Sequence, residues 1–228
     1  MSEWWTYTLS SFLLFSPRTY YRTIELYNLA IWPAQLAGVA IGLAIVALLF
    51  GKRGHRDQII AALLAACWLW VAWAFHYQRY AQINWVAPWF AAAFAFQASL
   101  LVVVGVVAGR IVFQSASGRE FWIAISLVAI AVCGYPLLAP LTGRAWTTVE
   151  TFGMAADPTA IATVAALGLV RGRIRWVLLV VPLLWCAVTA ATLWAMDAPE
   201  AVVVTGAALL ALLPATRGRR NGEPRAMR

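Results

Sequence analysis

The sequence has few charged residues. Only 11 % of its 228 residues are Asp, Glu, Lys or Arg, whereas 63 % are hydrophobic. Soluble globular domains carry about 25 % charged and about 45–50 % apolar residues. A water-soluble fold of this length could not bury so much apolar surface. The composition therefore excludes an ordinary soluble domain and predicts an all-α, polytopic bundle of membrane-spanning helices.

Residue types on which common membrane cofactors depend are also scarce. The single lysine, Lys52, follows an apolar run in a basic loop, which argues against a retinal Schiff base inside a helix. The two histidines, His55 and His76, do not lie at the matching depth that a bis-histidine haem requires. The three cysteines form no CxxC pair, and no HExxH, GxSxG, Walker or GxGxxG motif occurs. No cofactor is indicated, and no motif favours an enzyme.

Long apolar runs, in contrast, are abundant. A helix needs about 20 residues to cross the hydrocarbon layer, and on this measure seven spans are predicted. They cover residues 30–50, 58–77, 88–108, 121–140, 147–170, 174–196 and 199–214. We expect a single membrane domain over residues 1–216, in which residues 1–29 form an N-terminal interfacial segment rather than a cleaved signal peptide. A basic tail over residues 217–228 follows.

The distribution of basic residues predicts the orientation, because cytoplasmic loops are enriched in Lys and Arg. Thirteen of the 17 basic residues fall in alternate connections and in the tail, and the others are Arg18, Arg22, Arg79 and Arg144. Seven spans therefore place the N-terminus outside and the C-terminus inside. We expect the basic tail to contact the anionic inner leaflet of the lipid bilayer, and no nucleic acid.

The first polar stretch runs from Ser16-Pro17 to Gln35. Ser16 can cap a helix that begins at Pro17, and this helix can continue without interruption into the first span. Its polar side chains recur at spacings of three and four, and the resulting stripe includes Glu25, Asn28 and Gln35. One interpretation is an interfacial helix with its charges in water and headgroups. However, Gln35 brings the stripe into hydrocarbon, so we expect this face to contact protein.

Two further polar residues lie within predicted spans. His76, near the end of the second span, could carry a proton or bind a metal, or it could be a hydrogen-bonded residue at the membrane interface. Gln97 lies about 14 Å below Pro88, near the bilayer centre. Its amide needs a partner from another helix, from water or from a ligand.

The third polar stretch, residues 147–159, is the most informative. Asp157-Pro158 is a strong helix start with Asp157 as N-cap, and only 13 residues separate Pro158 from Arg171. About 20 Å of helix is too short for a hydrocarbon layer of about 30 Å. One interpretation is that the stretch that contains Glu150 is re-entrant or unwound, as in the broken helices of transporters. The alternative is that residues 146–170 form one tilted, kinked helix, or that the bilayer thins locally.

These polar residues could converge in the outer half of the bundle. The candidate site comprises Glu25, Asn28, Gln35, His76, Gln97, Glu150, Asp157 and Thr159. Carboxylates with one imidazole suit a hard or borderline divalent cation or a proton, with His76 and Asp157 as the candidate metal ligands. Alternatively, Arg18, Arg22 and Arg144 could pair with the acids in a structural network.

Several motifs carry a family resemblance. They are LLFSPRTYYRTIELYN with the following WPAQ, INW at 83–85, the Gln97 region, Tyr135-Pro136 and FGMAADPT at 152–159. Over most of its length the chain resembles an uncharacterised family of bacterial multi-pass membrane proteins of unknown function. Where that family looks to carry Cys-Pro-Thr, this chain has Asp157-Pro158-Thr159, which argues against soft-metal handling. The resemblance implies the fold and a bacterial inner membrane, and it brings no established activity.

Three functions remain in view. The first is a seven-helix inner-membrane protein, such as a transporter or channel, that binds or passes a small solute or cation through a site in its outer half. The second is a non-catalytic structural or accessory subunit of a larger membrane complex, whose polar stripe packs against a partner. The third is a membrane enzyme acting on a lipid or small substrate. The sequence leaves open whether the chain forms a homo-oligomer.

Overall fold

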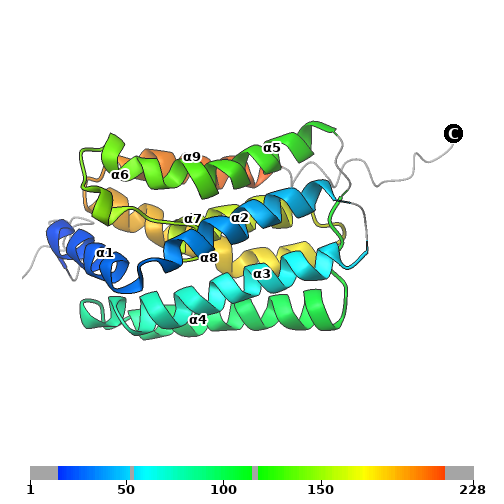
Figure 1. The fold of residues 1–228 in the computed structure, drawn as a ribbon, viewed down its shortest axis with the longest axis horizontal. Helices are drawn as coiled ribbons and strands as arrows, with labels where there is room; N and C mark the ends of the chain where they lie inside the picture. Colours follow the sequence, from blue (N-terminus) through cyan, green and yellow to red (C-terminus); the bar gives the residue numbers. More distant parts are fainter. Residues whose placement is uncertain (1–14, 52–53, 115–117, 214–228) are drawn as a thin grey trace, which may run out of the picture.

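The computed structural model describes residues 15–51, 54–114 and 118–213, which form a bundle of helices (Figure 1). These residues contain no β-strand, only an isolated antiparallel bridge between Phe113 and Val170. The prediction of an all-α fold is confirmed. The predicted basic tail, 217–228, and residues 1–14 of the predicted interfacial segment lie outside the described residues.

The helices run back and forth along the length of the bundle. Three of the longer ones are continued by π-helical or 3-10 turns that keep the same direction. The bounds are α1 Pro17–Ile31, α2 Ala34–Phe50, α3 Arg56–Trp70 with Val71–Tyr77 and Tyr80–Gln82, α4 Ala87–Leu100 with Leu101–Val107, α5 Gly118–Ala129 with Ile130–Gly134 and Tyr135–Leu137, α6 Leu138–Leu141, α7 Ala156–Gly168, α8 Ile174–Ala195 and α9 Glu200–Ala211.

Four helices in the described part of the chain are long and apolar enough to cross a membrane. They are the continuous helices Arg56–Gln82, Ala87–Val107, Gly118–Leu141 and Ile174–Ala195. The pair α1 and α2 passes the same test together, and α9 is apolar but shorter. Four to five candidate spans of this kind indicate a membrane protein.

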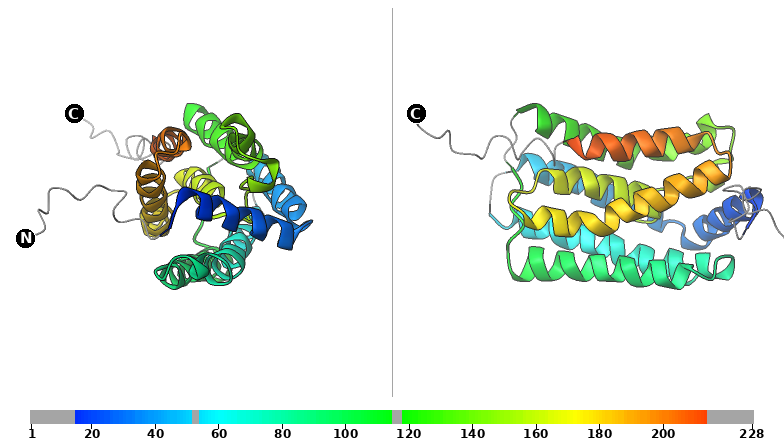
Figure 2. Two further views of the ribbon diagram at one scale, coloured as in Figure 1. Left: turned by 90° about the vertical axis from the view of Figure 1, so that its left-hand side faces the viewer. Right: turned by 180° about the vertical axis from the view of Figure 1, so that it is seen from behind.

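The prediction of one uninterrupted helix from Pro17 to Phe50 is wrong. Ser16 does cap α1, since its side chain accepts a hydrogen bond from the Thr19 N–H at 3.2 Å. However, Pro33 has no N–H and its ring obstructs the preceding turn. Helix α1 ends at Ile31, and α2 leaves at 90° to it. Helix α1 therefore lies across one end of the bundle, here called the α1 end, whereas α2 runs along the bundle (Figures 1 and 2).

Helix α7 lies inside the bundle, surrounded by the other helices (Figure 2, left). Every residue from Glu150 to Val170 is buried, and α7 packs against α3, α5, α8 and α9. Six of its 13 residues are alanine or glycine, which lets the neighbouring helices approach closely. The predicted fifth span, 147–170, is therefore α-helical only from Ala156 to Gly168, after a 3-10 turn at Trp146–Thr148. Of the two interpretations of this stretch, the structure has the unwound one.

Gln97 replaces a hydrogen bond that Pro182 removes from α8. Because proline has no N–H, the carbonyl of Leu178 lacks its partner four residues later in the helix. The side-chain amide of Gln97, which is fully buried, donates to this carbonyl at 3.0 Å. Gln97 therefore has the partner on another helix that the sequence required, and it joins α4 to α8.

We expect Gln97→Leu to lower the free energy of unfolding by about 1–3 kcal/mol, because the Leu178 carbonyl would stay buried without a donor. The matched control combines Gln97→Leu with Pro182→Ala, which restores a backbone N–H for that carbonyl. Thermal unfolding in detergent should show that the double variant recovers most of the stability lost in Gln97→Leu. A double variant no more stable than Gln97→Leu would contradict this account.

Candidate functional site

The candidate site lies where the chain enters α7, in the half of the bundle nearer α1. Residues 142–155 connect α6 to α7 and carry Glu150 into the interior. Asp157, in the first turn of α7, contacts Thr189 on α8. About 9 Å of helix separates Thr189 from Ala195, the last residue of α8. The site is thus enclosed by protein below the α1 end.

Three neutral groups donate hydrogen bonds to the Asp157 carboxylate. The Trp185 indole N–H and the Thr189 hydroxyl donate to Oδ1 at 2.8 and 2.7 Å, and the Tyr135 hydroxyl donates to Oδ2 at 3.2 Å. Asp157 is not the N-cap that the sequence predicted, because Ala155 holds that position and the carboxylate is directed to α8 and Tyr135 instead. Asp157 forms no ion pair with any described Lys or Arg.

Two other buried carboxylates share one guanidinium. Arg144 Nε lies 2.7 Å from Glu200 Oε1, and Arg144 Nη2 lies 4.0 Å from Glu150 Oε2. The Tyr21 ring covers the same guanidinium, with its centroid 4.4 Å from Cζ. The predicted pairing of Arg144 with Glu150 is therefore formed. Glu200 joins it without having been predicted, and the network does not reach Asp157.

Negative charge exceeds positive charge among these side chains. Asp157, Glu150 and Glu200 are 3 %, 9 % and 3 % exposed. Within the described residues, Arg144 is the one basic side chain in ion-pair contact with any of them, and it pairs with Glu150 and Glu200 but not with Asp157. Three carboxylates and one guanidinium give a net charge of −2 when all four are ionised. An uncompensated carboxylate is costly away from water, so this arrangement favours uptake of a cation or a proton.

The polar stripe of α1 faces the connection between α6 and α7. The Asn28 amide donates to the carbonyls of Thr147 and Val149 at 2.9 and 2.7 Å, and the Gln35 amide donates to the Asn28 carbonyl at 2.8 Å. This face therefore contacts protein, as Gln35 led us to expect. The Asn28 amide fixes the connection, the Gln35 amide joins α2 to α1, and neither is hydrogen-bonded to Asp157.

Glu25 belongs to a separate, more exposed pair. It accepts hydrogen bonds from Arg22 at 2.6 Å and from the Thr147 hydroxyl at 3.2 Å. The hydrogen bond from Arg22 is the main cause that lowers the pKa of Glu25 below its ordinary value. Glu25 is thus ionised at neutral pH and already paired, which sets it apart from the buried carboxylates.

His76 lies among aromatic rings and has no hydrogen-bond partner among the described residues. Its side chain is fully buried. The imidazole packs edge-on against Phe94 and Trp185, with ring centroids 4.5 and 4.7 Å apart. No group of three or more His, Cys, Asp and Glu side chains in the described segments could hold a metal ion. The candidacy of His76 and Asp157 as metal ligands stays a prediction.

The unwound segment 149–155 is fixed on several sides. The Thr159 hydroxyl accepts a hydrogen bond from the Gly153 N–H at 2.8 Å, and Tyr27 donates to the Met154 carbonyl at 2.9 Å. Gly153 has φ +78°, a conformation that favours glycine. On α2, a side chain at Gly38 would overlap with the Phe152 carbonyl oxygen. Thr159 thus shapes the entry to α7 and does not contact the Asp157 carboxylate.

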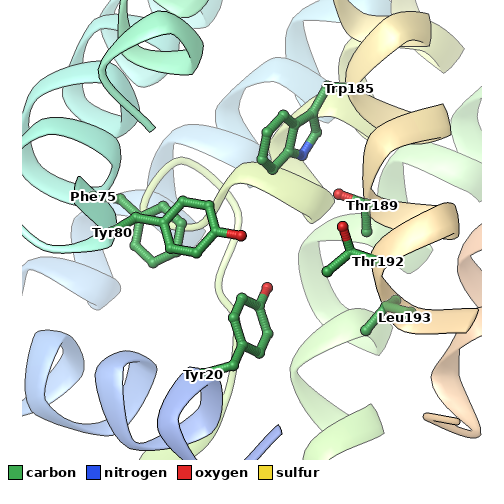
Figure 3. A pocket seen from close by; sticks show the side chains of 7 residues that line it. All are labelled: Tyr20, Phe75, Tyr80, Trp185, Thr189, Thr192 and Leu193. Atoms are coloured by element: carbon green, nitrogen blue, oxygen red, sulfur yellow. The ribbon is translucent and has the colours of Figure 1, made fainter. Parts of the chain in front are cut away.

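A small cavity lies beside Thr189 (Figure 3). Its volume is about 10 Å³, which is room for about one water molecule. It is lined by Tyr20, Phe75, Tyr80, Trp185, Thr189, Thr192 and Leu193. Figure 3 shows the hydroxyl groups of the two tyrosines and the two threonines directed toward one common space.

Comparison with known proteins gives a family but no activity. A family model described as a family of unknown function (DUF6064) matches residues 18–223. The chain belongs to this family. The DUF6064 match runs from the second residue of α1 to beyond α9 and includes every residue of the candidate site, in agreement with the expected uncharacterised family. No curated protein and no solved structure matches the chain.

Sequence reasoning missed four residues of the site: Tyr135, Trp185, Thr189 and Glu200. Trp185 and Thr189 are four residues apart on α8, which places both on one face of that helix. This spacing was the available signal, but it names no partner. Glu200 stands at the start of an apolar helix, where an acidic residue is ordinary, so nothing in the sequence linked it to Arg144.

Proposed function

We propose that the chain is a bacterial inner-membrane protein with seven spans that binds or passes a small cation, a proton included, at its buried carboxylates. Helices α2, α3, α4, α5, α7, α8 and α9 would be the spans, with the N-terminus outside and the α1 end at the outer face. The positive-inside distribution of Lys and Arg supports this orientation. The site then lies in the outer half of the bundle.

The observation that carries the proposal is the excess of buried carboxylates. Among the described residues, one guanidinium, that of Arg144, pairs with both Glu150 and Glu200. The third carboxylate, Asp157, accepts hydrogen bonds only from neutral donors. Ionisable side chains inside a membrane protein are costly and commonly mark ion or proton pathways. The unwound entry to α7 agrees with this role, since broken helices line the binding sites of transporters.

The two alternatives have less support. A subunit that offers its polar stripe to a partner would leave that stripe free, whereas Asn28 and Gln35 are bonded within this chain. An enzyme acting on a lipid would need room for a headgroup, whereas the cavity beside Thr189 has room for about one water. Cation binding uses the carboxylates that both alternatives leave unexplained.

The test is a flux assay on the full chain in liposomes. Separate gradients of H⁺, Na⁺, K⁺ and Mg²⁺ are imposed, and ion-sensitive dyes report their decay. We expect wild-type protein to dissipate at least one gradient and Asp157→Asn to reduce that rate to the level of protein-free liposomes. Glu25→Gln is the matched control, because Glu25 is partly exposed and paired with Arg22.

Binding without passage is tested in parallel by measuring the melting temperature in the presence of each of the same ions and at several pH values. A stabilisation present in wild type and absent in Asp157→Asn supports a binding role. The proposed function is refuted if no gradient decays and if no ion or pH step shifts the melting temperature of wild type differently from that of Asp157→Asn. The carboxylate is then structural.

A further inference from the structure

We infer that the cation taken up by Asp157 is a proton, and that it enters from the cavity beside Thr189 through the Thr189 hydroxyl. This inference rests on the proposed function and specifies its ligand and its route.

The groups around Asp157 present hydrogen atoms rather than lone pairs. An indole N–H can only donate, and Trp185 directs it at Oδ1. The Thr189 and Tyr135 hydroxyls also donate to the carboxylate. Ca²⁺ requires 6–8 oxygen ligands and Mg²⁺ an octahedral set, and the described residues offer no group of even three ionisable ligands. A proton needs one carboxylate oxygen and no additional space.

The same groups can also accommodate the protonated acid. A hydroxyl both donates and accepts, so Thr189 or Tyr135 can reverse its hydrogen bond and accept from a protonated Asp157. Trp185 keeps its role as donor, because a carboxylic acid oxygen still accepts. Both protonation states of Asp157 therefore have hydrogen-bond partners without movement of the backbone.

Two residues that line the cavity, Trp185 and Thr189, contact Asp157 directly, and of these only the Thr189 hydroxyl can both donate and accept a proton. The Thr189 side chain lines the cavity and donates to Asp157 Oδ1 at 2.7 Å. The other hydroxyl groups of the lining come from α1 (Tyr20), from the turn after α3 (Tyr80) and from α8 (Thr192), as Figure 3 shows. Since the cavity has room for about one water molecule, water there would contact Thr189 directly.

The proton step is balanced. A hydronium ion in the cavity gives one proton to Thr189 Oγ1, and the original Thr189 O–H bond breaks as its proton passes to Asp157 Oδ1. Water and an intact threonine hydroxyl remain, and the carboxylate becomes a neutral carboxylic acid. The titratable or charged groups that influence Asp157 electrostatically are Tyr20 on α1, Tyr80, Tyr135, Arg144, Glu150 and Cys186 on α8.

The ligand is tested by infrared difference spectroscopy on the full chain in lipid, with pH steps as the only change. Acidification should produce the carbonyl stretching band of a protonated carboxylic acid, and Asp157→Asn should abolish it. Glu25→Gln should leave that band unchanged. If the band is absent, or persists fully in Asp157→Asn, Asp157 does not take up the proton and the inference is wrong.

The route is tested by the rate at which this band appears after a rapid pH jump. Thr189→Val removes the hydroxyl at similar side-chain volume and should slow the appearance of the band by about tenfold or more. Thr189→Ser keeps the hydroxyl and should keep the wild-type rate. Thr205→Val on α9 is the control for loss of a threonine hydroxyl elsewhere. If Thr189→Val does not fold, Thr192→Leu, which fills the cavity, takes its place. An unchanged rate overturns the route.

The inference and the proposed function fail in different ways. Chlorides of Na⁺, K⁺ and Mg²⁺ at constant pH are the comparison probes in the same infrared experiment. If no pH-dependent band depends on Asp157 but one of these ions shifts its carboxylate band, the proton is wrong and cation binding stands. If neither pH nor any ion changes an Asp157 band, both are wrong.

Discussion

Replacing Gly38 with valine is expected to lower the free energy of unfolding by about 3 kcal/mol or more, at the upper end of overpacking effects. A Cβ atom at this position would overlap with the Phe152 carbonyl oxygen and would lie 3.2 Å from the Met154 side chain. The obstacle is a backbone carbonyl, which cannot move aside as a flexible side chain could. Helix α2 and the unwound segment would have to separate.

The unwound segment has little freedom to yield. Gly153 is bonded to Thr159, and the Met154 carbonyl is bonded to Tyr27 on α1. Displacing the segment would therefore break these bonds and shift Glu150 and Asp157. We expect Gly38→Val to lose the site as well as stability, so that flux in liposomes falls together with the melting temperature.

Gly206→Val is the matched control for this substitution. Gly206 lies in α9, and a Cβ atom there would meet no other heavy atom within 4 Å. Valine has a higher helix propensity than glycine, so this variant should match or slightly exceed wild-type stability. Thermal unfolding of both variants in the same detergent makes the comparison. A Gly38→Val protein as stable as Gly206→Val would show that α2 does not pack on residues 149–155.

Asp157→Leu should cost about 3–5 kcal/mol of unfolding free energy, because three buried donors would lose their acceptor and each costs about 1–3 kcal/mol. The Thr189 and Tyr135 hydroxyls can rotate to reduce this loss. The Trp185 N–H is fixed by its ring and cannot. Asp157→Asn keeps an acceptor oxygen for the indole, so it should cost only about 1 kcal/mol.

A double variant distinguishes lost hydrogen bonds from altered packing. Thr189→Val removes one of the three donors, so Asp157→Leu with Thr189→Val should be more stable than the sum of the single effects predicts. Chemical or thermal unfolding in detergent measures all three variants. Strict additivity would mean that the Thr189 hydroxyl does not depend on the Asp157 carboxylate.

The sequence predicts the parts of this fold that depend on local chemistry. Apolar runs predicted the long helices, and Ser16-Pro17 predicted the start of α1. The short distance from Asp157 to Arg171 made unwound chain before α7 one of two interpretations. Each of these rests on a few neighbouring residues and a length. The helix N-cap was misplaced by two residues, because the Asp157 side chain has partners on other elements.

The direction of α2 and the partners of the site could not be predicted in this way. Pro33 can interrupt a helix, but the 90° bend places α1 against Trp146–Thr148, a contact between segments far apart in the sequence. The hydrogen bond from Gln97 to the Leu178 carbonyl, which Pro182 leaves without a helix partner, joins two residues 81 positions apart in the sequence. His76 looked like a functional group because imidazole is chemically versatile, whereas its aromatic surroundings are visible only in three dimensions.

The enclosed position of α7 has a consequence for how the protein is made. At 13 residues, α7 is about 20 Å long and would not reach across the hydrocarbon layer alone. Its burial against α3, α5, α8 and α9 means that its final neighbours include two helices synthesised after it. We therefore expect α7 to be retained beside the insertion machinery until α8 and α9 emerge, so that the central helix of the bundle is among the last to reach its final position.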